Sequence, residues 1–211
     1  MIESRNNNFN HLKIHTQYSI CEGAIKIDDL KDFSKENKIR SLGLSDTSNL
    51  CGALEFAEKI SKSGTQPIIG TQINFRYDNI TGLLPLFALN EEGYKRIIEL
   101  SSLSFLKNDQ MSDPHLELKE LLIKNSGVAI FSGTIHGLFG KLFNKGKFTD
   151  VKNLYSSIKS KFHDRFYIEI QRHGDLNEIG FEKFNLGLSL NLEVPIIATN
   201  EVFYINKDMH E

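Results

Sequence analysis

The chain has 211 residues, with 25 Lys plus Arg against 27 Asp plus Glu, and a formal net charge of −2 at pH 7. This length suits one domain with a sizeable hydrophobic core. The near-neutral charge excludes a global basic surface for nucleic acid, so any contact with DNA is expected to be indirect. The polar N-terminus and the lack of any run of about 18 apolar residues predict a cytoplasmic protein without membrane contact.

Short apolar runs alternate with segments of helical periodicity along the chain. This alternation is typical of parallel strands joined by crossover helices. We predict strands over residues 10–15, 41–45, 68–75, 83–89, 128–132, 166–170 and 194–199. We predict helices over residues 27–37, 50–61, 91–106, 116–123, 151–162 and 180–191. No repeat or linker divides the chain, so residues 1–211 are expected to form a single domain.

Local signals refine some of these boundaries. In the helix over 27–37, the apolar residues Ile27, Leu30 and Phe33 share one face opposite charged residues. Asp113 followed by Pro114 is typical of a helix start, which would leave His115 on the surface. Glycine at position 137, directly after His136, indicates a turn or a helix entry rather than a catalytic histidine.

About seven strand and helix units fit either a barrel or an open doubly wound sheet. The glycine-rich phosphate-binding patterns of open nucleotide-binding sheets do not follow any predicted strand. Barrels collect functional residues at the carboxyl ends of their strands. Polar residues stand at those ends here, namely His15, Asp46, Gln72, Thr134 and Glu201. We therefore predict an α/β fold with a TIM-like β/α barrel.

Five segments carry a resemblance to a known family. They are HLKIHTQYSICEGAIKI, LGLSDTSNLCGALEFAEK, PIIGTQINF, VAIFSGTIHG and VPIIATNEVFYINKDMHE, in this order along nearly the whole chain. Together they resemble the polymerase and histidinol phosphatase (PHP) domain, in the form found at the N-terminus of bacterial DNA polymerase III alpha subunits. The resemblance implies a distorted seven-stranded β/α barrel. Active members of the family hold two or three metal ions that activate water for phosphoester hydrolysis.

The family's metal ligands are only partly retained in this chain. By resemblance, the expected residue is kept at His15 and Asp46, and a carboxylate is kept at Glu22 and Glu201. Other residues replace the family's ligands at Lys13, Thr47, Gln72, Pro85, Thr134 and Phe203. A protonated lysine has no free lone pair, proline and phenylalanine offer no ligand, and glutamine and threonine are neutral and weak.

These replacements predict a barrel without a metal centre. We expect no catalytic residue and no cofactor, and at most one weakly bound divalent metal at the remaining candidates His15, Glu22, Asp46 and Glu201. Converging carboxylates without a metal need a positive group beside them. Lys13 shares a strand face with His15, because side chains alternate with period two. It is therefore the expected partner of the carboxylates, and Pro85 and Phe203 are expected to fill the remaining space.

The resemblance implies the N-terminal PHP domain of a longer replicative chain, a DNA-directed DNA polymerase and nucleotidyltransferase, in DNA replication. Within that chain we expect a catalytically inactive, structural and partner-binding module. Its implied partners are the polymerase body of the same chain and a proofreading exonuclease subunit. One alternative is an active metal-dependent phosphoesterase or 3′–5′ exonuclease, with Glu22 and Glu201 replacing aspartates. Another is a free-standing binding protein, which requires that the gene end at Glu211.

Overall fold

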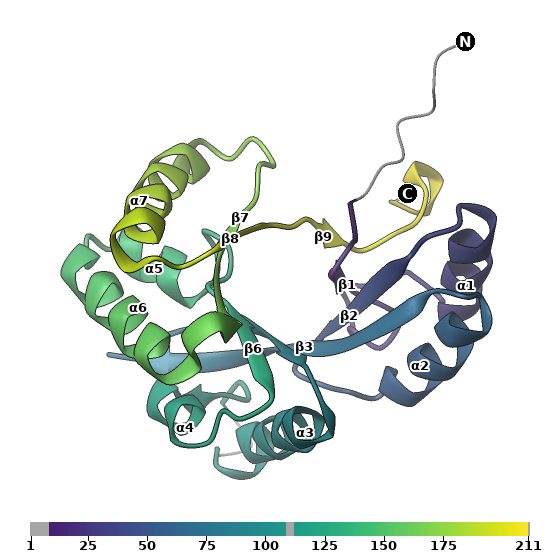
Figure 1. The fold of residues 1–211 in the computed structure, drawn as a ribbon, viewed down its shortest axis with the longest axis horizontal. Helices are drawn as coiled ribbons and strands as arrows, with labels where there is room; N and C mark the ends of the chain where they lie inside the picture. Colours follow the sequence, from purple (N-terminus) through teal and green to yellow (C-terminus); the bar gives the residue numbers. More distant parts are fainter. Residues whose placement is uncertain (1–8, 109–111, 211) are drawn as a thin grey trace.

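The computed structural model describes residues 9–108 and 112–210. Within these residues nine strands form one curled, mixed sheet, and helices cover its outer face (Figure 1). The strand order is β8-β7-β6-β4-β3-β2-β1-β9, with β5 paired to β3. This arrangement confirms the predicted α/β barrel class.

The strands and helices have the following bounds. The strands are β1 Lys13–Ile14, β2 Ser41–Thr47, β3 Gln66–Tyr77, β4 Ile80–Ala88, β5 Leu116–Glu117, β6 Val128–Phe131, β7 Phe166–Ile170, β8 Ile196–Ala198 and β9 Glu201–Val202. The α-helices are α1 Ile27–Glu36, α2 Ala53–Lys62, α3 Glu91–Leu106, α4 Leu118–Ile123, α5 Leu138–Asn144, α6 Phe148–Phe162 and α7 Leu176–Leu192. Two short 3-10 helices are η1 His163–Arg165 and η2 Lys207–His210.

The sheet is mixed, not all parallel as the sequence pattern suggested. Strands β3 and β4 are antiparallel, and so are β4 and β6. The turn between β3 and β4 consists of Asp78 and Asn79, whose φ angles are 47° and 59°. Two consecutive residues with positive φ match the twist of an antiparallel hairpin, and Asp and Asn tolerate this conformation.

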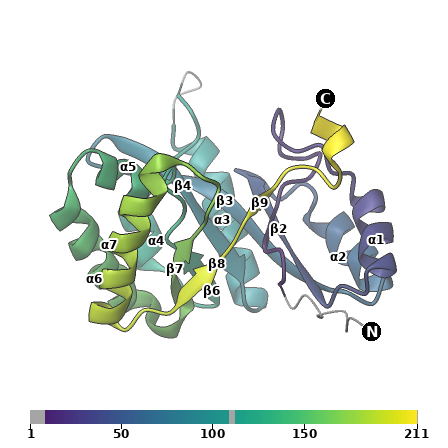
Figure 2. The same ribbon diagram turned by 90° about the horizontal axis from the view of Figure 1, so that it is seen from above.

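The chain itself joins the two ends of the curled sheet. Strands β8 and β9 lie at opposite ends of the strand order, yet only Thr199 and Asn200 separate them. Figure 2 shows this segment crossing from the half that contains β7 and α7 to the half that contains β2 and α1. Strand β9 then pairs in parallel with β1.

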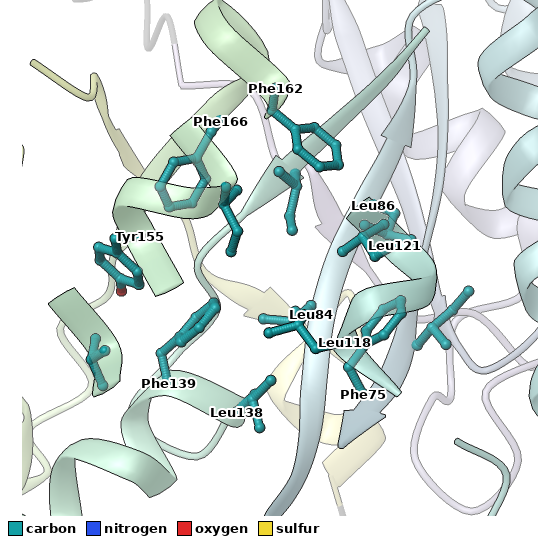
Figure 3. Packing of buried hydrophobic residues seen from close by; sticks show 14 of the residues in the cluster. Phe75, Leu84, Leu86, Leu118, Leu121, Leu138, Phe139, Tyr155, Phe162 and Phe166 are labelled. Atoms are coloured by element: carbon teal, nitrogen blue, oxygen red, sulfur yellow. The ribbon is translucent and has the colours of Figure 1, made fainter. Parts of the chain in front are cut away.

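Two apolar clusters hold the helices to the outside of the sheet. The larger packs α3 to α7 against β3, β4, β6 and β7, and Figure 3 shows side chains of α4, α5 and α6 pointing toward Leu84 and Leu86 of β4. In this cluster the rings of Phe139 and Tyr155 meet edge to face at 4.9 Å. The second cluster packs α1 and α2 against β1 and β2.

Alternation along the strands separates this outer core from the barrel interior. In β6, Ile130 belongs to the outer cluster, whereas Ala129 and Phe131 form a small inner cluster with Phe87 of β4. In β1, Ile14 packs outward. Its neighbours Lys13 and His15 are therefore directed to the interior, as the period of two predicts.

Two local predictions differ from the structure, and a third is confirmed. Asp113 and Pro114 do not start a helix, because residues 116–117 first pair with β3 and α4 begins at Leu118. His115 is buried, not on the surface, and its Nδ1 lies 2.7 Å from the carbonyl oxygen of Asp113. The indicated helix entry at Gly137 is confirmed, since this residue caps α5, a helix that the periodicity did not reveal.

Among the described residues, no helix combines the length and the apolar character needed to cross a lipid bilayer. The longest, α7, has 17 residues and includes Glu178, Glu182 and Lys183. It packs on the sheet through Phe181 and Leu188.

Candidate functional site

A pocket of about 430 Å³ opens at the carboxyl ends of the parallel strands β1, β2, β7 and β9. Seven of the residues at family ligand positions line it, namely His15, Glu22, Thr47, Gln72, Thr134, Glu201 and Phe203. Leu83, His136, Gly137, Gln171 and His173 complete the lining. The other three positions, Lys13, Asp46 and Pro85, are buried.

Lys13 is the centre of a buried charge cluster that also contains Glu169 and Glu201, here called the Lys13 cluster. The ammonium group donates to Glu169 Oε1 at 3.0 Å and forms a second ion pair with Glu201. The side chains of Lys13 and Glu169 are fully buried, and 19% of the Glu201 side chain is exposed. The register of β1 and β9 places Lys13 directly beside Glu201.

Electrostatics keep Lys13 charged inside the barrel. Burial alone would lower its pKa, because desolvation penalises the ammonium form. The nearby carboxylates of Glu169 and Glu201 outweigh this effect and raise the pKa above the usual 10.5. The interior of the barrel therefore holds a fixed positive charge at neutral pH.

Glu169 is anchored by several polar groups. Its Oε1 accepts hydrogen bonds from Gln171 Nε2 at 2.9 Å and from the Thr199 hydroxyl, in addition to the bond from Lys13. Its backbone N–H donates to Ser132 Oγ at 2.9 Å. Its second oxygen, Oε2, is buried and has no hydrogen-bond partner among the described residues.

His15 connects the Lys13 cluster to the pocket. Its Nε2 lies 2.6 Å from Glu201 Oε2, a distance at which the ring nitrogen donates to the carboxylate. Gln72 Nε2 donates to the same oxygen at 3.1 Å. Phe203 stacks on the imidazole with ring centroids 4.5 Å apart, so this side chain fills apolar space as expected.

Asp46 is held by hydroxyl and amide donors of the loop that follows β1. Oδ1 accepts from the Thr16 backbone N–H at 2.6 Å and from Ser19 Oγ at 2.9 Å, and Oδ2 accepts from Thr16 Oγ1 at 2.8 Å. The loop folds tightly back on itself at Gly23, where a Cβ would lie 2.2 Å from the Thr16 carbonyl oxygen. Asp46 is thus bound into the loop structure.

The remaining candidates lie apart from the Lys13 cluster. Glu22 is exposed and accepts a hydrogen bond of 2.5 Å from Thr47 Oγ1, and its carboxylate lies 3.8 Å from His15 Nδ1. Pro85 is buried opposite Gln72 in the ladder of β3 and β4. The expected pairing of Lys13 with all three carboxylates therefore holds for Glu201 only, while Glu22 and Asp46 have other partners.

This donor set does not fit a binuclear metal centre. The ammonium of Lys13 lies between two of the carboxylates, and His15 Nε2 and both oxygens of Asp46 are already engaged. In the described ranges 9–108 and 112–210, no group of three or more His, Cys, Asp or Glu side chains is arranged to hold a metal ion. Whether the protein binds a metal stays a prediction.

The Lys13 cluster predicts a loss of stability in acid. Burial would raise the pKa of Glu201, but the hydrogen bond from His15 and the charge of Lys13 lower it from 4.5 to about 2. Between these two values the unfolded chain binds more protons than the folded one, so stability falls as the pH drops from 4.5 toward 2. Urea unfolding followed by circular dichroism at a series of pH values measures this slope.

Glu201→Gln is the matched control for this pH dependence. The variant lacks the titrating carboxylate, so its stability should change less between pH 4.5 and pH 2 than that of the parent protein. Equal slopes in the two proteins would contradict the role assigned to Glu201.

Several residues in and around the site were not anticipated from the sequence as part of it. Glu169, the second partner of Lys13, is the single charged residue of the otherwise apolar strand β7, FYIEI. A charged residue in an apolar strand was the sequence signal that could have identified it. His136 lies 3.4 Å from Asp175 across the pocket rim, between Nε2 and Oδ2. His173 Nε2 lies 2.9 Å from Gln171 Oε1, which extends the polar network to the rim.

Comparisons with known proteins show the family of this chain. The family model described as "PHP domain" matches residues 11–173. A DNA polymerase III subunit alpha from Rickettsia felis is 33% identical over 204 residues, which cover 96% of this chain and 17% of the relative. The Caulobacter vibrioides subunit is 31% identical and covers 100% of this chain and 19% of the relative. The chain thus spans less than a fifth of these relatives' length.

A solved structure shows the same fold. The similar protein is an amidohydrolase from Chromobacterium violaceum, described with bound sulfate and no metal. The TM-score is 0.60 at 11% sequence identity, and the match covers 94% of this chain and 89% of the other. At this identity the likeness concerns the fold alone.

Proposed function

This chain belongs to the PHP domain family, and from that premise we propose that it is the PHP domain of a DNA polymerase III alpha subunit that lacks metal-dependent hydrolytic activity. Its role in such a subunit is structural and partner-binding. The whole subunit would be a cytoplasmic DNA-directed DNA polymerase. The likeness of nearly the whole chain to a small part of two such subunits supports this proposal.

One observation carries the proposed loss of hydrolysis, namely the position of the Lys13 ammonium. It is hydrogen-bonded between Glu169 and Glu201, where a divalent cation would need those carboxylates as ligands. A metal there would have to displace a buried positive charge or lie against it, and both are unfavourable. The barrel thus uses an internal ion pair to neutralise carboxylates that a cation would otherwise neutralise.

The proposed partners follow from the size of the relatives. The polymerase body of the same chain is the first, because the matched subunits extend far beyond the matched region. A proofreading exonuclease subunit is the second. Contact with DNA would be indirect, in keeping with the net charge of −2.

Metal analysis of the full-length chain tests the proposal that the barrel lacks metal-dependent activity. In the proposed inactive barrel the pocket binds no metal, so we expect the amounts of zinc and manganese retained after dialysis to be the same in the parent protein and in His15→Ala. Elemental analysis by mass spectrometry makes this comparison. Two or more ions per chain that disappear in His15→Ala, together with hydrolysis of a generic phosphoester, would establish an active phosphoesterase instead.

A further inference from the structure

Helix α7 carries an apolar stripe that the domain leaves uncovered. The stripe consists of Leu176, Ile179, Leu186 and Leu190, of which Leu176 is 88% and Leu190 82% exposed. These positions recur at helical spacing and share one face. The opposite face packs on the barrel through Phe181 and Leu188. A helix that is apolar on both faces is typical of one buried on both sides.

The surroundings of the stripe form a shape suited to a protein partner. Figure 1 shows α7 at the periphery of the domain, beside α5 and α6. A groove of about 450 Å³ runs along Leu176, Ile179 and Leu186, and another of about 390 Å³ lies between α6 and α7. In the second groove, a Cβ built on Gly187 would meet nothing within 4 Å, so a partner backbone can approach closely.

Charge helps to select the occupant of this surface. Lys183 lies at the centre of the stripe, seven residues from both Leu176 and Leu190. A second copy of the chain, packed with two-fold symmetry about this centre, would place two Lys183 ammonium groups together. Like charges at a desolvated contact are unfavourable. The charged residues that line the groove between α6 and α7 are Lys152 and Lys183, and in the part of the chain that the structure describes neither forms an ion pair, so an acidic group of the partner is favoured there. The groove along the stripe has mixed charge, because Asp175, Glu178 and Glu182 line it together with Arg172 and Lys183.

We propose that the α7 stripe is the surface on which the polymerase body of the same longer chain docks, through an apolar segment that presents an acidic group to the groove between α6 and α7. This inference rests on the proposed function, since the matched relatives are more than five times longer than this chain. Covalent linkage gives an effective concentration of about millimolar, so a modest apolar patch suffices for stable docking. The exposed stripe is then buried in the intact protein.

Site-specific labelling of the full-length chain tests the docking. Cysteine is introduced as Leu190→Cys or Ile179→Cys, and its rate of maleimide labelling is followed by peptide mass spectrometry. Leu54→Cys, on α2, is the matched control, because Leu54 is also a leucine with 71% exposure, on another helix. We expect the α7 positions to react at least about tenfold more slowly than the control. Equal rates would overturn the proposal.

Two further labelling experiments test for other partners on the α7 stripe. Protection of α7 that is lost on dilution would indicate a second copy, and protection that appears only when an exonuclease subunit is added would indicate that subunit. Either result overturns docking of the same chain. Template-directed primer extension by the same preparation tests the proposed function separately, so its failure with intact protection of α7 would leave the docking surface in place.

Discussion

Replacing Lys13 with alanine is expected to destabilise the domain by about 3–5 kcal/mol, the usual cost of removing one partner from a buried ion pair. The variant leaves the carboxylates of Glu169 and Glu201 together without their shared cation. Glu169 is fully buried, so it cannot recover the lost interaction from water. Urea unfolding at neutral pH, followed by circular dichroism, measures the change.

Two controls separate this effect from the general cost of a substitution. Lys59→Ala removes a surface lysine of α2 that pairs with Glu55 of α2 and with Asp28 of α1, and its effect should be small because such pairs are solvated. Adding Glu169→Gln to Lys13→Ala should restore part of the lost stability, because it removes one uncompensated charge. An unchanged unfolding midpoint in Lys13→Ala would show that the Lys13 cluster does not stabilise the fold.

Asp46→Ala is expected to lower the free energy of unfolding by about 3 kcal/mol, since hydrogen bonds to a charged group contribute about 1.5–3 kcal/mol each and are not additive. The substitution removes the acceptor of three hydrogen bonds, from the Thr16 N–H, the Thr16 hydroxyl and the Ser19 hydroxyl. Thermal and urea unfolding measure the loss. Asp46→Asn keeps the volume and one carbonyl oxygen, so its effect should be smaller.

Asp46 stands at a family ligand position in a barrel that is proposed to lack metals. The bonds to Thr16 and Ser19 give Asp46 a structural role that does not depend on a cation. If Asp46→Ala and Asp46→Asn were both as stable as the parent protein, that structural explanation would fail.

The sequence predicts the barrel and much of its mouth because both depend on simple periodicities. Period two places Lys13 and His15 on one inner face, and the ends of parallel strands bring Glu201 to the same place. Glu169 was harder to anticipate. A charged residue in an apolar strand can face either side of a sheet, and only the burial of Phe166 and Ile168 on the outer side shows that Glu169 points inward.

Other differences arise where tertiary contacts override local signals. The Asp113-Pro114 pair has the composition of a helix start, but the chain first pairs with β3 and buries His115. Helix α5 has seven residues, too few to show a clear period, and its stability comes from packing Leu138, Phe139 and Leu142 into the core. The antiparallel direction of β4 relative to β3 depends on the turn at Asp78 and Asn79. The signal for this turn lies in the local backbone geometry of these two residues and not in the hydrophobic periodicity of the strands.

The joining of the sheet ends by β8 and β9 has a consequence for the order of folding. The contacts of the first strand are among the most distant in the chain, with a sequence separation of 156 from Lys13 to Glu169 and of 186 from His15 to Glu201. Contacts of such long range slow folding, because loop closure must precede the gain from the contact. During synthesis on a ribosome, Lys13 lacks its second counter-ion, Glu201, until β9 is made. Until then, the edge of β1 that pairs with β9 is unpaired. The Lys13 cluster is therefore complete only when nearly the whole domain has been synthesised and the two ends of the sheet have been joined.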